Sequence, residues 1–144
     1  MYFYGGPAHS PFRLDKLLAQ ARARAPDSAP RPARASSRFV YFAELAPGAQ
    51  AGDGQAVTAL VDDACDGADV ERGGLVVVPR PGTISPWSTK ATDIARACGL
   101  QGVRRLERGV LWQLTDAAGR PLEGPGAAAV LPLLHDRMTE AVLE

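Results

Sequence analysis

The sequence predicts an α+β fold in which a β-α-β-α unit occurs twice and the two copies pack as a pseudo-dimer. Short β-prone runs alternate with segments whose apolar residues recur at helical spacing. The two halves also resemble each other. The Ser-Pro-aromatic sequence of residues 10–12 recurs at 85–87, and the pattern Val-x-x-Leu-Val-x-Asp of residues 57–63 recurs, with Leu for the second Val, at 130–136.

A chain of 144 residues accommodates one compact domain, and neither half has enough residues for a core of its own. We therefore expect a single domain over residues 1–144, built of repeats that span about residues 1–70 and 71–144. Sheets covered by amphipathic helices would form the shared core.

The first repeat opens with a strand at residues 2–4, which the Gly-Gly-Pro sequence of residues 5–7 interrupts. A helix from Pro11 to Ala23 follows, because Ser10 is a good N-cap and proline is favoured at the first helical position. Its apolar stripe recurs at i, i+3, i+4 and i+7 and consists of Leu14, Leu17, Leu18 and Ala21.

Residues 25–37 contain three prolines and few apolar side chains, which predicts an exposed, partly extended linker. A strand over residues 39–45 then precedes a second amphipathic helix. The apolar positions of that helix are Val57, Leu60, Val61 and Ala64.

The second repeat begins with a β-branched run at residues 75–78, which is typical of a strand covered on both faces. Ser85 caps a third helix that ends at Gly99, a favoured residue just beyond a helix. The predicted apolar face of this helix is Trp87, Ala91, Ile94 and Cys98.

A long strand over residues 103–114 follows, with Gly109 as a possible bulge. A last helix comes after the polar loop of residues 116–126. Pro132 should lie in its first turn, because an interior proline is unfavourable. The predicted apolar face is Leu131, Leu134, Met138 and Ala141.

The chain has no net charge, which gives no reason to expect a nucleic-acid or membrane partner. The neutrality conceals an uneven distribution: residues 1–40 have a net charge of +5 and residues 41–80 a net charge of −5. Such a distribution suits an interface as well as separately solvated faces. No membrane span or signal peptide is evident, so we expect a cytoplasmic protein.

Neither a metal site nor a catalytic constellation is predicted. Cys65 and Cys98 form no disulfide framework or zinc motif and should be inert packing thiols. The two histidines, His9 and His135, have no nucleophile elbow beside them. The carboxylates of Asp62 and Asp63 should be solvated.

The segment from residue 78 to 94 is the most unusual, because hydroxyls crowd a glycine turn and a helix start between two cations. Free N–H groups there could hold a phosphate or carboxylate. Capping and packing explain the same residues, with Trp87 as an anchor in the core. The candidate binding or interdomain residues, including two near the end of the chain, are Arg80, Thr83, Ser85, Trp87, Ser88, Thr89, Lys90, Asp93, His135 and Arg137.

Residues 79–94 resemble, nearly letter for letter, a signature of the N-terminal domain of the large, single-chain phosphoribosylformylglycinamidine synthases, also called FGAR amidotransferases. Residues 10–18, 41–45, 106–109 and 134–140 agree with it as well. Thr89 stands where many relatives have Ser, which keeps the hydroxyl.

The resemblance implies the N-terminal part of a purine-biosynthesis ligase that amidates formylglycinamide ribonucleotide with glutamine and ATP. It implies a fold like a dimer of the separate small subunit of the same enzyme in other bacteria. ATP and Mg²⁺ would lie in a central synthetase domain and the glutaminase would be C-terminal, so no catalytic residue and no cofactor is assigned to this segment.

The implied role is to bridge those two domains and support ammonia transfer, and the natural chain is then expected to continue past Glu144. The alternative is a free-standing regulatory module that binds a small anionic ligand at the loop from Thr83 to Lys90.

Overall fold

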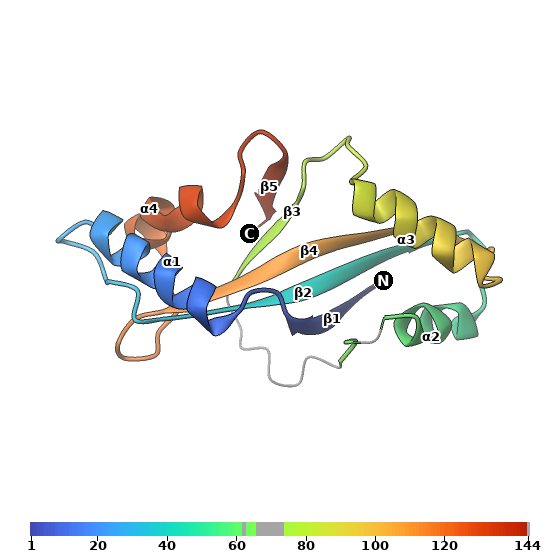
Figure 1. Ribbon diagram of the computed structural model, residues 1–144, viewed down its shortest axis with the longest axis horizontal. Coiled ribbons are helices and arrows are strands. Elements are labelled where there is room, and N and C mark those ends of the chain that lie inside the picture. Colours follow the sequence, from blue (N-terminus) through green and yellow to red (C-terminus); the bar gives the residue numbers. More distant parts are fainter. Residues whose placement is uncertain (62, 66–73, 144) are drawn as a thin grey trace.

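The computed structural model describes residues 1–61, 63–65 and 74–143, and the fold of this part of the chain is α+β (Figure 1). The sheet has the strand order β1-β2-β4-β3-β5, and every pair of neighbours is antiparallel. Its strands are β1 (Tyr2–Pro7), β2 (Arg34–Leu45), β3 (Leu75–Pro79), β4 (Val103–Thr115) and β5 (Glu140–Leu143). The predicted boundary between the repeats, near residue 70, lies outside the described residues.

The central strands β2 and β4 pair along their whole lengths, from Arg34 opposite Thr115 to Leu45 opposite Val103. The helices form two pairs near opposite ends of these long strands, α1 with α4 and α2 with α3 (Figure 1). They are α1 (Pro11–Arg24), α2 (Ala51–Ala59), α3 (Pro86–Ala97) and α4 (Gly124–Leu134).

Each helix pair covers its own hydrophobic core. The α2–α3 core contains Val57, Ala95 and Leu106, and the α1–α4 core contains Ala21, Trp112 and Val130. Leu106 and Trp112 are an even number of residues apart on β4, so both cores lie on the same face of the sheet. Within the described residues, no helix is long and apolar enough to span a membrane.

The start of α1 confirms its prediction. Pro11 follows the Ser10 cap, and the Ser10 Oγ accepts a hydrogen bond from the Arg13 N–H at 3.4 Å. Leu18 and Ala21 are buried, and Leu14 packs against the same core. The predicted stripe therefore faces inward.

The predicted linker over residues 25–37 is wrong at both ends. Ala25 is buried, and β2 begins at Arg34, which lies opposite Thr115. Pro32 is fully buried, and its carbonyl accepts a hydrogen bond from the Arg22 Nε at 2.9 Å. Pairing with the distant β4 extends the strand through a segment whose composition alone suggests a solvated chain.

The last predicted helix is too long. It ends at Leu134, Met138 is exposed, and the chain turns into β5, which pairs with the edge of β3. Pro132 lies inside the helix near its end, and the proline of the first turn is Pro125. The strand forms because β3 offers backbone hydrogen-bonding groups that a helix could not use.

Three smaller predictions also fail. The helix α2 ends at Ala59 and does not extend to Ala64. The run of residues 75–78 is half-buried apart from Val77, because the helices lie on one face of the sheet. Gly109 pairs with Val40 without a bulge, and a Cβ there would lie 2.7 Å from the Val77 carbonyl oxygen, so close approach of β3 explains the glycine.

Candidate functional site

The turn between β3 and α3 is closed by its own backbone. Gly82 has φ +84°, a conformation that favours glycine, and the Thr83 N–H donates to the Arg80 carbonyl at 3.0 Å. The Thr83 hydroxyl donates to the same carbonyl at 2.6 Å. The Arg80 N–H donates to the Thr139 carbonyl at 2.9 Å, which joins this turn to the start of β5.

The helix α3 starts and ends as the sequence predicts. The Ser85 Oγ accepts a hydrogen bond from the Ser88 N–H at 3.0 Å, and Pro86 occupies the first turn. The helix gives way to Cys98 and then to Gly99, which has φ +89°. These ends depend on neighbouring residues, which is why local sequence predicts them.

A buried carboxylate of β4 lies beside this cap. Glu107 is 8% exposed, and its carboxylate accepts hydrogen bonds from the Ser85 Oγ at 2.8 Å, the Arg105 Nη2 at 2.8 Å and the Arg108 N–H at 2.9 Å. Burial raises the pKa of Glu107, but these hydrogen bonds outweigh it and lower the pKa below its ordinary value. Glu107 is therefore ionised at neutral pH.

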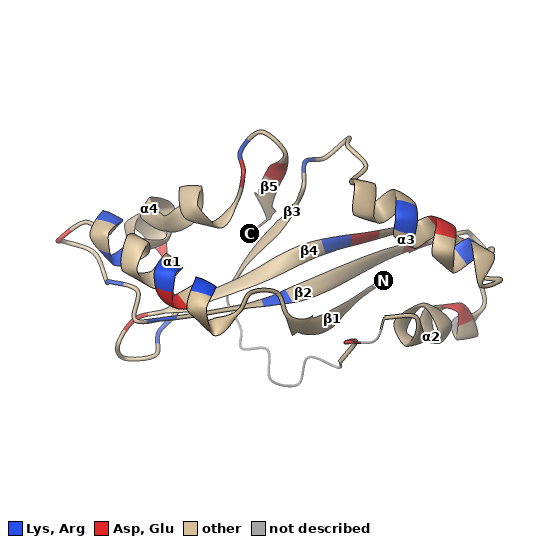
Figure 2. Cartoon of the chain, in the orientation of Figure 1, with Lys and Arg blue, Asp and Glu red and all other residues tan. Residues whose placement is uncertain are grey.

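Arg105 connects the same carboxylate to the turn. Its Nη2 also donates to the Thr83 carbonyl at 2.9 Å, and its Nε donates to the Ser88 Oγ at 3.4 Å. Figure 2 shows basic and acidic positions side by side on β4, near α3. The strand thus holds the turn and the first turn of α3 in one arrangement.

The buried face of α3 carries hydroxyls. Ser88 is 1% exposed and Thr92 7%, and the Thr92 Oγ1 accepts a hydrogen bond from the Leu106 N–H at 3.0 Å. The Leu106 N–H is free to make this bond because β3 pairs with residues 110–112 of β4 and does not reach Leu106. The helix α3 supplies the acceptor there instead.

The predicted apolar face of α3 is therefore confirmed for Trp87 and Ala91 and wrong for Ile94 and Cys98. Ile94 is 50% exposed and Cys98 is exposed, whereas Trp87 and Ala91 pack at the margin of the α2–α3 core. Cys98 is therefore not the packing thiol that the sequence predicts. The helix turns its hydroxyls inward because they accept hydrogen bonds from donors of β4.

Trp87 belongs to an aromatic group around a guanidinium. Its ring lies 5.8 Å from that of Tyr41, and the Arg108 guanidinium lies 4.9 Å from the Trp87 ring and 4.4 Å from the Phe39 ring. Both distances fall in the range of cation–π attraction. Trp87 is thus the packing anchor that the sequence predicts.

The Asp63 carboxylate ties this aromatic group to the chain after α2. It accepts hydrogen bonds from the Tyr41 hydroxyl at 3.0 Å and the Gly6 N–H at 2.9 Å, so it is not merely solvated, and Asp62 lies outside the described residues. Burial, together with the hydrogen bond and the charge of Asp63, raises the pKa of Tyr41 to about 12.

The outer side of α3 borders a groove. Thr89, Lys90 and Asp93 are exposed, and Figure 2 shows the charged positions along the helix. The groove has a volume of 380 Å³ and is lined by Leu60, Val61, Trp87, Lys90, Ala91, Ile94 and Leu106. It presents an apolar surface with a single cationic side chain among the residues that line it.

The structure does not bring His135 and Arg137 to the start of α3. The His135 Nδ1 is 2.8 Å from the Leu131 carbonyl of its own helix. Arg137 is exposed, and its guanidinium forms no hydrogen bond or ion pair with another described residue. These residues belong to the connection between α4 and β5, which meets the β3–α3 turn through the Thr139 carbonyl.

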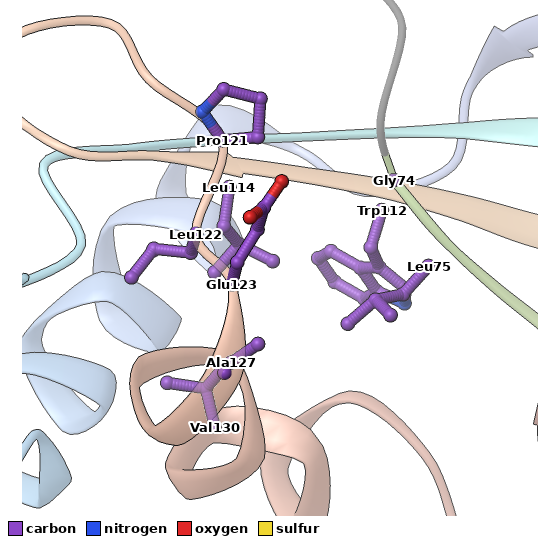
Figure 3. Close-up of a pocket in the computed structure, with 10 residues that line it drawn as sticks. Gly74, Leu75, Trp112, Leu114, Pro121, Leu122, Glu123, Ala127 and Val130 are labelled. Carbon is purple, nitrogen blue, oxygen red and sulfur yellow. The ribbon is translucent and has the colours of Figure 1, made fainter. Parts of the chain in front are cut away.

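A separate pocket of 370 Å³ lies beside the start of α4 (Figure 3). Trp112 and Leu75 form one side of it, Leu122 and Val130 the other, and the Glu123 carboxylate is the charged group of its lining. It contains none of the predicted site residues.

Sequence reasoning missed Arg105 and Glu107, although opposite charges at alternate positions of an apolar strand lie on one face and could have suggested a pair. The Arg105–Glu107 pair argues against the hypothesis that the start of α3 binds an anion. The Glu107 carboxylate already lies at the α3 cap and would repel a second anion. Within the described residues, no group of three or more potential ligands could hold a metal ion.

A comparison with protein families adds to this geometry. The sequence profile described as formylglycinamide ribonucleotide amidotransferase N-terminal matches residues 38–144, which includes most of β2, the whole α3 region and β5. The match covers well over half of the chain, as the resemblance of residues 79–94 suggests. The chain therefore belongs to the family of formylglycinamide ribonucleotide amidotransferase N-terminal domains.

Proposed function

We propose that this chain is a structural domain of a phosphoribosylformylglycinamidine synthase, that it bridges the synthetase and glutaminase domains, and that it supports ammonia transfer between them. It would be inactive alone. ATP and Mg²⁺ would act in the synthetase domain, and purine biosynthesis would place the enzyme in the cytoplasm.

The observation that carries this proposal is how the hydroxyls of the signature are used. Ser85, Ser88 and Thr92 bond to Glu107, Arg105 and the backbone of β4. The signature thus builds a rigid helix start and leaves an apolar groove on its outer side. Such a surface suits another protein domain better than a small polar substrate.

We further infer that the domain is built from a duplicated unit. Tyr2 lies opposite Phe42 in one strand pair, and Val76 lies opposite Leu111 in the other. Val76 follows Tyr2 by 74 positions, close to the 75 that separate Ser10 from Ser85. The matching helices contribute Val57 and Val130, both 0% exposed, one to each core.

The duplication can be tested with half of the chain. Residues 71–144 expressed alone should form a dimer, because β4 would otherwise expose the edge that it presents to β2. Analytical ultracentrifugation would measure the mass, and a stable folded monomer would contradict the inference.

The main proposal is tested by deleting this domain from the full synthase that contains it. We expect formation of the amidine product to fail with glutamine as the nitrogen donor and to persist, at least in part, with ammonium salts. Glutamate release without matching product would show the uncoupling directly. Unchanged glutamine-dependent synthesis after the deletion would overturn the proposal.

The anionic-ligand alternative has its own test. Calorimetry with phosphorylated metabolites would compare the unmodified chain with Lys90→Ala, and a heat that disappears in the variant would favour the alternative. The Glu107 carboxylate beside the cap leads us to expect no heat in either protein.

A further inference from the structure

We propose that the groove between the end of α2 and the helix α3, defined above by its seven lining residues, docks an amphipathic helix of the catalytic part of the synthase. Apolar side chains of that helix would enter the groove, and an acidic residue would pair with Lys90. This inference rests on the proposed function and specifies the partner of the same surface.

The apolar stripe of α3 provides the first argument. Trp87, Ala91 and Ile94 recur at i, i+4 and i+7, which is the spacing of a helix that packs against another element. The α2–α3 core uses this stripe only at its margin, through the half-buried Trp87 and Ala91, whereas Ile94 is 50% exposed. The stripe thus ends at an exposed apolar residue, Ile94, that the core leaves for another packing partner.

The groove gives that face a defined shape. Leu106, which is 3% exposed, and the half-buried Ala91 lie in its lining, and Leu60 borders it with 37% of its surface exposed. Isolated exposed apolar residues are ordinary on protein surfaces. Here Leu60 and Ile94 border one groove of 380 Å³, so the exposure is concentrated where a partner could cover it.

The ridge along α3 indicates a helical occupant. Residues at i+3, i+4 and i+7 form ridges that interdigitate with the ridges of a second helix. Helix-in-groove recognition uses apolar anchors at this same spacing. The stripe of α3 runs alongside the groove, so a helix packed against it would cover Trp87 and Ile94 together.

Charge indicates the acidic residue of the partner. Lys90 is the charged residue among those that line the groove, and its ammonium forms no hydrogen bond or ion pair with another described residue. The Arg108 guanidinium lies 4.9 Å from the Trp87 ring and adds positive charge nearby. Asp93 does not line the groove but a neighbouring hollow, which shares Lys90 and Ile94 with it.

Photo-crosslinking in the full synthase tests the contact. A photoreactive benzoylphenylalanine at position 94 should crosslink to a peptide of the catalytic part that is helical, apolar on one face and acidic near the point of attachment. The same residue at Gln20, exposed on α1, is the control and should not yield that crosslink. Crosslinking to a basic or non-helical peptide would overturn the proposal.

Charge reversal tests the pairing. We expect Lys90→Glu to lower the glutamine-dependent rate of the synthase about tenfold, and reversal of the crosslinked acidic residue to Lys to restore it. Lys16→Glu, at an exposed position of α1, should leave the rate within about twofold. Failure of the reciprocal change to rescue the rate would contradict the pairing.

The two proposals fail separately. If deletion of the domain leaves glutamine-dependent synthesis intact, the bridging function is wrong. If deletion abolishes it while Ile94→Asp and Lys90→Glu are silent, the domain is needed but the groove is not its docking site. Circular dichroism of each variant should show an unchanged fold, because both side chains are largely exposed.

Discussion

Two helices of this chain start with the same local sequence and differ in what surrounds them. Ser10 and Ser85 both cap their helices, and a proline follows each. The aromatic residue next in line is 77% exposed at Phe12 but half-buried at Trp87, where it packs against Tyr41. The cap is thus a local property, whereas burial of the aromatic ring depends on distant strands.

The strands beside the two caps explain the difference. The β4 strand places Glu107 and Arg105 at the start of α3. Near the start of α1, the Ser37 hydroxyl of β2 lies 2.8 Å from the His9 Nδ1, and the His9 ring stacks on Trp112 at 4.6 Å. The Arg105–Glu107 ion pair at the start of α3 and the uncharged His9–Ser37 pair near the start of α1 thus occupy comparable places. The following predictions contrast the two helix starts.

The largest effect should come from Trp87→Ala. We expect a loss of about 3 kcal/mol in the free energy of unfolding, because the ring contacts Tyr41 and Arg108. Urea unfolding followed by circular dichroism would measure it. A loss below about 1 kcal/mol would show that Trp87 is no more important than an exposed aromatic residue.

Glu107→Gln should cost about 2 kcal/mol at neutral pH, because three donors would lose an ionised acceptor. The pKa of Glu107 is lowered in the folded state. Its ionised form therefore contributes stability above the unfolded pKa, and this contribution is lost as the pH falls through the folded pKa.

The difference between Glu107→Gln and the unmodified chain should accordingly shrink in acid, as urea titrations at a series of pH values would show. Glu44→Gln, at an exposed position of β2, is the control. A difference that is constant down to low pH would contradict the assignment of the ionised form.

The two caps should differ in the cost of losing the serine. Ser85→Ala should cost about 1.5 kcal/mol and Ser10→Ala about 0.5 kcal/mol. Ser85 accepts from Ser88 at 3.0 Å and also donates to Glu107, whereas Ser10 accepts from Arg13 at 3.4 Å. Equal losses in thermal unfolding would show that the contact with Glu107 adds nothing to the cap.

The His9 pair should respond to acid. Burial lowers the pKa of His9, and the charge of Arg13 lowers it further. Neutral His9 therefore contributes stability above its unfolded pKa, and this contribution is lost as the pH falls through the lower folded pKa. His9→Gln should make unfolding less dependent on pH on the acid side of neutrality. An unchanged dependence would show that His9 has the same pKa in both states.

The smallest effect should come from Phe12→Ala, which we expect to change the unfolding free energy by less than about 0.5 kcal/mol. The ring is 77% exposed and belongs to neither core. A loss as large as that of Trp87→Ala would mean that the two aromatic residues are equivalent after all.

Much of the site could be predicted because it is continuous in sequence. Arg80, Thr83, Ser85 and Ser88 fall within one turn and one helix start, and their spacing indicates a capped helix. Arg105 and Glu107 could not be placed beside them, because about twenty residues intervene. The contact exists only once β4 pairs with β2 and α3 packs on its edge.

The sequence by itself determined the helix starts at Ser10 and Ser85, the helix end at Gly99 and the long strand β4, because caps and strand periodicity depend on near neighbours. It also determined the family, through the residues of the α3 region.

Only the tertiary structure decided that Arg34 and Glu140 begin strands and that α3 turns its hydroxyls inward. The physical reason is the same in each case. Backbone groups of β4 and β3 need hydrogen-bond partners, and the segments that reach them adopt the conformation that supplies those partners.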